Sequence, residues 1–298
     1  MTVERLSAAE ALLTATGEYR VLRRRPRVTA YNPPDTEPCK LALYVDVETT
    51  GLDPRNDRII QFSGVLFEFS TASGKIFRVY PAVECYEDPG RPIPFVVVRK
   101  TGITDAMVSG KRLDDSMILA AVAKASLVIA HNASFDRCFL ERRLRAFAEK
   151  HWACSQADVA WPDNGYDSAK LEFLLYKHAN VYYEAHRADE DCYAGIHLLA
   201  TPFESGDLPM RLLLESARRT TCRIWAIHSP ISTKDLLKAR GYRWCNGDDG
   251  RPKAWWKDVP EAERPAELAW LSENVYQNTI AVPRVERIYA RRRYSDRA

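Results

Sequence analysis

Apolar and polar positions in the first part of the chain alternate in a way that predicts strands first and helices later. Apolar side chains fill positions 41–45 behind a Pro-rich segment, which predicts a strand buried on both faces. Two further strand-like runs cover 58–70 and 75–85, with short turn segments between them. Three strands joined as hairpins are therefore expected.

Helix-like and strand-like segments alternate after residue 110. Apolar periodicity predicts helices over 114–125, 135–150 and 168–179 and from Arg187 onward, with strands over 126–133 and 153–157. Antiparallel strands followed by such alternation predict an α/β fold, with a mixed sheet flanked by helices.

Shifts in composition divide the chain into three predicted parts. These are an N-terminal extension (1–37) with a short amphipathic helix over 5–17, an α/β domain (38–204), and a smaller α+β C-terminal domain (205–298). The last part contains strand, helix and hairpin patterns, a helix near 261–276, a basic closing strand, and five of the seven tryptophans.

Composition narrows the class of protein. The 298 residues suffice for about two domains, and 46% apolar and 28% charged residues are ordinary for a globular chain. No apolar run approaches the roughly 18–20 residues that span a bilayer, so we expect a cytoplasmic protein with no membrane partner. Seven cysteines without a C-x-x-C pair favour reduced thiols over a disulfide framework or a zinc site.

The first candidate chemistry lies at the end of the buried strand. Asp46 and Glu48 are two residues apart, so both side chains point to one face, with carboxylates roughly 6–7 Å apart. Buried carboxylates stay ionised only with compensation, and a hard cation such as Mg²⁺ supplies it. The alternative is a strand end at which both acids are solvated.

Two further segments carry an acid or a histidine. Asp136 falls in the first turn of the predicted helix after the strand 126–133, where it could simply complement the helix dipole. His186 precedes the last predicted helix, and Asp191 falls on the second turn of that helix. Alone, such a histidine is often only a cap or a core residue. Together, four acids and one histidine suit phosphodiester hydrolysis by two divalent ions, with histidine as a base of near-neutral pKa.

The segments "DVETTGLDP", "AHNASFD" and "HRADED" resemble, in order and spacing, the three motifs of the DEDDh family of 3′-to-5′ exonucleases, which includes the epsilon subunit of DNA polymerase III. "KTGIT" and "SAKLEFL" resemble segments between these motifs. The resemblance covers about 40–200 and implies an RNase H-like fold with a mixed five-stranded sheet. It implies two divalent ions, Mg²⁺ or Mn²⁺: Asp46 bridges both, Glu48 and Asp191 bind the first, and Asp136 holds the second.

The resemblance also implies that His186 is the general base on the attacking water. It implies contacts to the terminal nucleotide from Thr49, Leu52, Asn132 and Phe135. The expected substrate is a nucleic acid with a free 3′ end, single-stranded DNA in the leading interpretation. A 3′-to-5′ exoribonuclease and a non-catalytic nucleic-acid-binding protein on a nuclease scaffold are the alternatives.

The C-terminal part lies outside the resemblance and favours a stand-alone nuclease over a proofreading subunit. Residues 1–204 carry a net charge of about −3 and residues 205–298 about +6, which suggests a basic module that meets a polyanion, or a solvated basic tail. Two interpretations remain open for its tryptophans. They stack on unpaired bases, or they form a small domain's core. The first interpretation rests on the interleaved cations and aromatics Arg243, Trp244, Arg251, Lys253 and Trp255.

Overall fold

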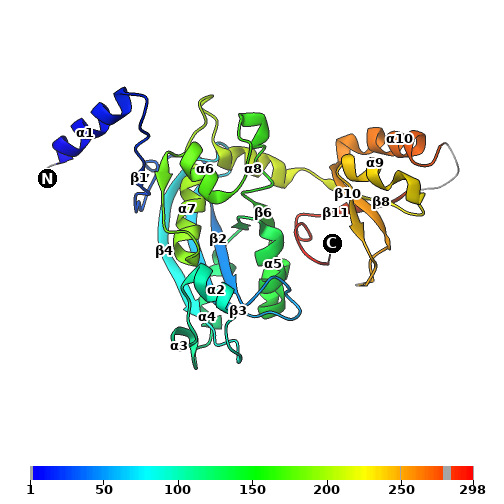
Figure 1. Cartoon of the computed structure of the whole chain (residues 1–298), viewed down its shortest axis with the longest axis horizontal. Helices are drawn as coiled ribbons and strands as arrows, with labels where there is room; N and C mark the ends of the chain where they lie inside the picture. The colour runs from blue at the N-terminus through cyan, green and yellow to red at the C-terminus, as the bar shows by residue number, and fades with distance from the viewer. Residues whose placement is uncertain (1–2, 249, 278–282, 298) are drawn as a thin grey trace. The chain divides into compact units, whose positions relative to one another are not determined.

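The computed structural model describes residues 3–248, 250–277 and 283–297. It separates into two compact units. The first comprises Met1–Ser216 together with Tyr294–Asp296, and the second comprises Ala217–Arg293 with the last two residues (Figure 1). The division into domains at residues 37 and 204 stays a prediction.

A five-stranded sheet forms the centre of the first unit. Its spatial order is β4-β3-β2-β5-β6, in which β2, β3 and β4 are antiparallel and β5 and β6 run parallel to β2. The strands are β2 (Cys39–Thr49), β3 (Ile59–Ser70), β4 (Ile76–Tyr86), β5 (Leu127–Ala130) and β6 (Trp152–Cys154). This mixed sheet with flanking helices is the expected RNase H-like α/β fold.

Helices cover the two faces of this sheet. The helices of the unit are α1 (Val3–Ala15), α2 (Phe95–Thr101), α3 (Asp105–Val108), α4 (Asp115–Lys124), α5 (Ala133–Arg143), α6 (Leu171–Lys177), α7 (Ala188–Ala200) and α8 (Pro209–Arg218), with 3-10 turns at Arg145–Glu149 and Pro162–Asn164. One core cluster joins Leu43 and Val45 to α4 and α5. On the opposite face, Tyr44 lies directly beneath Gly195 of α7.

Alternation along β2 therefore decides which side chains reach the site. Residues 42–45 are all buried, as expected for a strand covered on both faces. The even positions point to the α7 side, so Asp46 and Glu48 follow Tyr44 toward the first turn of that helix.

The N-terminal extension differs from its prediction. Its helix α1 forms, but the described side chains of α1 are almost all exposed, so no apolar face is buried. From Arg23 onward the extension instead packs on the first unit. Strand β1 (Arg23–Arg24) pairs in parallel with β7 (Val181–Tyr182), and the Tyr31 amide donates to the Phe77 carbonyl at 3.0 Å.

Three helices were not predicted, and α2 matters most because it borders the site. Its segment follows two prolines and begins with Phe95 and three valines, a composition that favours strand or loop. One position also shifts: Asp191 lies in the first turn of α7, not the second. None of the helices in the described segments is both long and apolar enough to cross a membrane.

The second unit is an antiparallel sheet of four strands in the order β11-β8-β10-β9. Its elements are β8 (Thr221–Ala226), α9 (Lys234–Ala239), β9 (Arg243–Cys245), β10 (Ala254–Pro260), α10 (Arg264–Asn274) and β11 (Arg284–Ile288). The predicted strand, helix, hairpin, helix and closing strand are all present. Gly241, shortly after α9, has a φ of +89°, the left-handed conformation that often ends a helix.

Candidate active site

Three carboxylates converge where β2 ends. Oxygen atoms of Asp46, Glu48 and Asp191 all lie within 4.8 Å of one another. A β-bulge between Glu48 and Thr49 interrupts the pairing with β3 at this point, and such bulges re-aim side chains next to functional sites. The predicted pair on β2 therefore meets the acid from the distant third motif.

Hydrogen bonds fix Asp191 at the N-terminal end of α7. The Tyr183 hydroxyl donates to its Oδ1 at 2.8 Å, and the Arg187 amide donates to its Oδ2 at 3.1 Å. Sequence reasoning missed Tyr183, because a tyrosine in a short polar loop carries no periodic signal. Together with the Arg187 amide, Tyr183 holds the Asp191 carboxylate in one orientation.

Asp136 lies in the first turn of α5 and lines the same cavity. It is 2% exposed, and its Oδ1 accepts a hydrogen bond from the Val47 amide at 3.1 Å. A merely solvated acid at a helix N-terminus is therefore excluded. Asp136 does not belong to the group within 4.8 Å, so its contact with a metal ion stays a prediction.

Burial raises the pKa of all four acids, and the charge of neighbouring acids raises it further. Burial first, and then the other acids, hold the pKa of Asp46 well above its usual range. Burial raises the pKa of Glu48 to about 7, that of Asp136 to about 8 and that of Asp191 to about 6. Lys100 lines the same cavity, and its charge lowers the pKa of Asp46 and Glu48, but this effect is smaller than that of burial.

His186 faces this cavity from the segment before α7. Its φ of +67° lies in the left-handed region, which is uncommon for a histidine and concentrates at functional positions. Burial first, and then the charge of Lys100, lower the pKa of its ring. The ring is therefore neutral near pH 7, the form that can accept a proton.

A second histidine, His131, also lines the cavity but is locked. Its Nε2 donates to the Ala169 carbonyl at 2.8 Å, and its Nδ1 accepts from the Ser155 hydroxyl at 2.9 Å. The Tyr44 hydroxyl in turn contacts Ser155 at 2.7 Å. Burial lowers the pKa of His131 to about 4, so its ring is neutral near pH 7, and its two hydrogen bonds tie the second motif to Ser155 and Ala169.

The cavity has a volume of about 410 Å³. Its lining includes all four acids, His186 and three of the four expected nucleotide contacts, Thr49, Leu52 and Phe135. Thr49 donates its hydroxyl to the Gly51 carbonyl at 2.6 Å, and Leu52 is 84% exposed at the mouth. Lys100 of α2 also lines the cavity, a cation that was not predicted because α2 was not.

Asn132 is the expected site residue that is absent from the cavity lining. It is exposed, caps α5 with a φ of +70°, and accepts a hydrogen bond from the Ser134 hydroxyl at 3.0 Å. Its backbone conformation gives asparagine a structural reason to be there. Its contact with a nucleotide stays a prediction.

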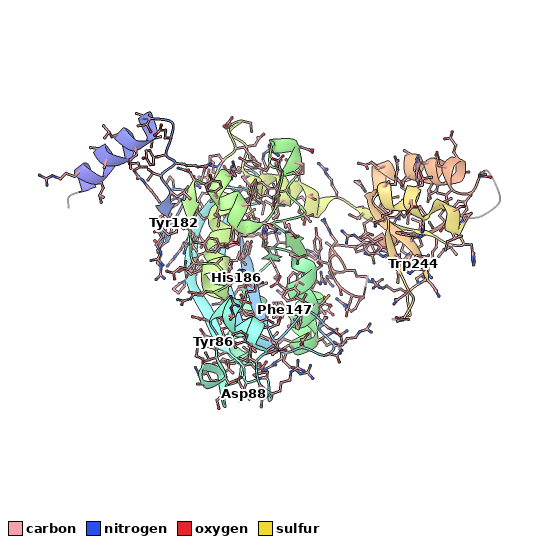
Figure 2. The ribbon with its side chains drawn as sticks, in the orientation of Figure 1. Tyr86, Asp88, Phe147, Tyr182, His186 and Trp244 are labelled. Atoms are coloured by element: carbon pink, nitrogen blue, oxygen red, sulfur yellow. The ribbon has the colours of Figure 1, made fainter. Side chains whose placement is uncertain are left out.

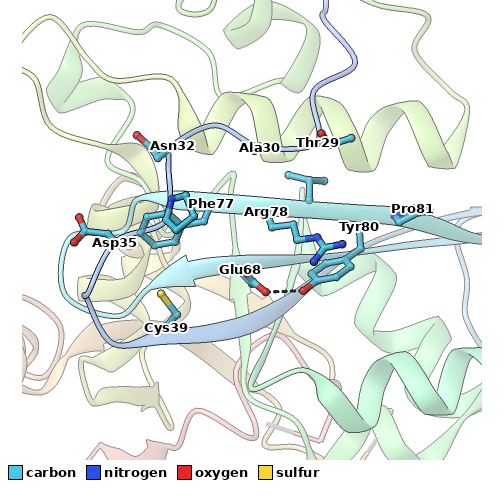
Figure 3. Close-up of a pocket in the computed structure, with 12 residues that line it drawn as sticks. Thr29, Ala30, Asn32, Asp35, Cys39, Glu68, Phe77, Arg78, Tyr80 and Pro81 are labelled. Carbon is cyan, nitrogen blue, oxygen red and sulfur yellow. Dashed lines mark hydrogen bonds between the residues drawn. The ribbon is translucent and has the colours of Figure 1, made fainter.

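A larger cavity of about 720 Å³ lies between the extension and β4 (Figure 3). Its two carboxylates are already engaged. Tyr80 donates its hydroxyl to Glu68 at 2.5 Å, and Asp35 pairs with Lys75 at 3.1 Å. It therefore offers no open carboxylate group of the kind around Asp46.

Figure 2 labels His186 in the first unit and Trp244 in the second.

A sequence profile of the exonuclease family (RNase_T) matches residues 43–199, more than half of the chain. The chain belongs to the exonuclease family. The matched segment runs from β2 to α7, so it contains the four acids, His186 and the strands that hold them.

Curated relatives of this exonuclease-family chain include two kinds of polymerase protein. It is 29% identical over 164 residues to the DNA polymerase III subunit epsilon of Treponema pallidum, covering 52% of this chain and 73% of the relative. It is 39% identical over 137 residues to the DNA polymerase III PolC-type protein of Listeria welshimeri, covering 45% of this chain and 8% of the relative. The chain thus spans less than a tenth of that PolC-type protein.

Two solved exonuclease structures align with parts of this chain. Exonuclease X in complex with 5′ overhanging duplex DNA aligns with a TM-score of 0.41 and 27% identity, over 53% of this chain and 89% of that one. E. coli Exonuclease I in complex with a dA16 oligonucleotide aligns with a TM-score of 0.45 and 19% identity, over 74% and 63% of the two chains. The family assignment rests on the profile match.

Proposed function

We propose that the chain is a metal-dependent 3′-to-5′ exonuclease that hydrolyses terminal phosphodiester bonds of DNA and releases nucleoside monophosphates. The observation that carries the proposal is the meeting of Asp46, Glu48, Asp136, Asp191 and His186 in one cavity. These side chains come from three distant segments, and a scaffold without activity has no need to bury them together.

The donor set fits divalent cations. Four carboxylates with raised pKa values lie around one cavity, and no ion pair between described residues includes any of them. Hard oxygen ligands of this kind suit Mg²⁺ or Mn²⁺. Asp46, Glu48 and Asp191 would hold one ion, and Asp46 with Asp136 a second. When bound, the ions lower the pKa of water and stabilise charge on the phosphate.

The protein side chains supply positioning and proton transfer. His186 accepts the proton of the attacking water, which its neutral ring allows and its place at the cavity wall favours. Tyr183 keeps the Asp191 carboxylate in one orientation. Thr49, Leu52 and Phe135 border the space for the terminal nucleotide, and Asn132 stands outside it in the structure.

DNA is favoured over RNA because the relatives named above are DNA polymerase proteins. RNA remains the competing substrate, since discrimination depends on contacts to the 2′-hydroxyl. A role in a polymerase assembly is a weaker candidate. The family profile matches residues 43–199 and does not extend to the second unit, so this chain carries a folded part beyond the exonuclease segment.

The test follows 5′-labelled single-stranded DNA and RNA of one sequence over time, with Mg²⁺, Mn²⁺ or EDTA. Stepwise shortening from the 3′ end that stops with EDTA and with Asp46→Ala supports the proposal. His186→Ala should lower kcat by about 10²–10⁴ while KM changes little, because a general base acts on the reacting proton. Equal loss with Asp163→Ala, an exposed acid outside the cavity lining, would contradict a specific role for Asp46.

A further inference from the structure

The two faces of the sheet in the second unit differ in what covers them. Helices α9 and α10 supply Leu237 and Leu271 to a core cluster with Cys222, Ile224 and Val259. Because side chains alternate along a strand, residues 223, 225, 256 and 258 point to the other face. The buried cluster there joins Trp225, Cys245 and Ala254 with Trp256 and Ile227, none of which belongs to a helix.

A row of cations and indoles crosses this second face. The pairing register places Arg243 beside Trp256, Trp256 beside Trp225, and Trp225 beside Arg284 across all four strands. The Arg223 guanidinium lies 4.2 Å from the centre of the Trp256 ring, and that of Arg243 lies 5.6 Å from it. We call Arg223, Trp225, Arg243, Trp256 and Arg284 the Arg–Trp face.

Some hydrogen-bond donors on this face lack acceptors, whereas Arg284 pairs with Glu286 at 2.5 Å. Arg223 is 6% exposed and gives two nitrogens to Asp258 at 2.8 and 2.9 Å, but its Nη1 has no partner. The Nε1 of Trp225, which is fully buried, also has none. The exposed Arg243 forms no ion pair with any described residue. Buried donors normally find acceptors. The guanidinium of Arg243 is exposed, so it is the donor of this face that an acceptor-rich ligand can reach directly.

The same register divides the tryptophans that the sequence analysis grouped together. Trp255 packs against the helix-side cluster and contacts Trp244 edge-on at 5.6 Å, so these two lie on the helix side. Trp256, which is half-buried, belongs to the Arg–Trp face. Trp244 and Trp255, on which the base-stacking interpretation rested, thus lie on the helix side, while the buried Trp225 and the half-buried Trp256 lie on the Arg–Trp face.

We propose that the Arg–Trp face binds an unpaired stretch of nucleic-acid strand. Indole rings stack on bases of any sequence, while guanidinium groups pair with phosphates, and this combination is typical of single-strand binding surfaces. Residues 217–293 contain sixteen lysines and arginines against nine acids, so the whole unit attracts a polyanion. The inference rests on the proposed function and adds a second contact for its substrate.

The test measures fluorescence anisotropy of a labelled thymidine oligonucleotide of about 12 nucleotides, with full-length protein carrying Asp46→Asn to prevent cleavage. Arg243→Ala should weaken binding several-fold and reduce the slope of log Kd against log salt by about one, because one phosphate contact is lost. Trp256→Ala should weaken it about tenfold through lost stacking. Lys238→Ala on exposed α9 removes the same charge from the other side and should leave Kd unchanged.

The outcomes separate the two proposals. If Arg243→Ala and Lys238→Ala bind alike with the same salt slope, the Arg–Trp face is not the binding surface. Arg243 is exposed, so this comparison holds even if Trp256→Ala fails to fold. A second arm follows cleavage of a dinucleotide, too short to reach beyond the active cavity. If wild type cleaves neither substrate, the proposed exonuclease activity fails, while an Arg243 effect on binding would still support the face. Repeating the binding measurement with an RNA oligonucleotide of equal length shows whether the Arg–Trp face prefers DNA or RNA.

Discussion

Four acids with raised pKa values, Asp46, Glu48, Asp136 and Asp191, place a cost on the folded state. Each carboxylate is easier to ionise in the unfolded chain than in this cavity, because burial and the neighbouring acids disfavour the charged form. Stability from these groups is therefore present at low pH and lost as pH rises through about 6 to 8. Activity and stability make opposite demands on these residues.

Removing one acid should stabilise the metal-free protein. We expect Asp46→Asn to abolish activity yet raise the free energy of unfolding by about 1–2 kcal/mol in EDTA, with a larger gain at pH 8 than at pH 6. Thermal unfolding at the two pH values measures this. Asp88→Asn is the matched control. Its carboxylate accepts from two glycine amides, which lower its pKa, so the same substitution should destabilise. A drop in Tm for Asp46→Asn would contradict the repulsion described here.

Gly195 of α7 lies so close to Tyr44 of β2 that there is no room for a larger side chain. A Cβ at this position would overlap the ring and hydroxyl of Tyr44, which is buried and cannot retreat. We expect Gly195→Ala to destabilise by about 1–3 kcal/mol, measured by urea unfolding, despite the better helix propensity of alanine. In a double-mutant cycle with Tyr44→Ala, the two effects should be less than additive. Additive effects would show that the two residues do not compete for the same space.

Some residues of the site could be predicted from short sequence motifs, and others could not. The four acids and His186 occur in short motifs whose spacing survives in the sequence, and the structure brings all five to one cavity. Tyr183 had no such signal, and Lys100 lies in the segment "KTGIT", which resembled the family without indicating a role for the lysine. One acts through a single hydrogen bond from a loop, and the other depends on a short helix whose valines favour a different element.

At the scale of elements, ion pairs from the N-terminal extension hold the first turn of α7. Arg25 pairs with Glu190 at 2.6 Å, and both side chains are almost fully buried. Arg27 reaches the other oxygen of Glu190 at 2.9 Å, but its side chain is 80% exposed. Because Glu190 immediately precedes Asp191, this pairing fixes the helical turn that carries a proposed metal ligand.

The two arginines should therefore differ strongly. Arg25→Ala leaves a buried carboxylate with only an exposed partner, so we expect a loss of about 3 kcal/mol in unfolding free energy. Arg27→Ala should cost less than about 1 kcal/mol, since exposed ion pairs contribute little. Chemical denaturation of both variants measures the difference. Equal losses would mean that burial of Arg25 contributes nothing to its pairing.

Elements were predictable where one face is buried and unpredictable where it is not. The strands β2 to β4 and the helix α7 follow apolar patterns because their buried side chains pack on one or both faces of the sheet. The extension could not be placed from its sequence, because its docking depends on ion pairs and on backbone pairing with β4 and β7, not on periodicity. The amphipathic pattern predicted for α1 found no partner surface in the described residues.

At the scale of the whole molecule, the first unit is discontinuous in sequence. Residues Tyr294–Asp296 belong to it although residues 217–293 form the second unit. Tyr294 packs against the core cluster of the sheet, Ser295 donates to Glu141 at 2.7 Å, and Asp296 pairs with Arg142 at 2.7 Å.

Shortening the chain at its end should therefore weaken the first unit. We expect a stop after Arg293 to lower the stability of that unit by about 1–3 kcal/mol, through lost packing and two lost polar contacts. The measurement is the Tm of the first unit. Its unfolding transition is identified as the one that shifts when Mg²⁺ is added. A chain ending at Asp296 is the control and should match the full chain. If both truncated chains unfold like the full chain, the contacts of 294–296 contribute no stability.

This discontinuity also sets an order during synthesis. The ribosome makes residues 217–293 before Tyr294, so the sheet that carries the acids emerges long before the last side chains that pack beside α5. The nascent nuclease unit therefore waits, incompletely packed on that side, until the whole second unit has left the exit tunnel.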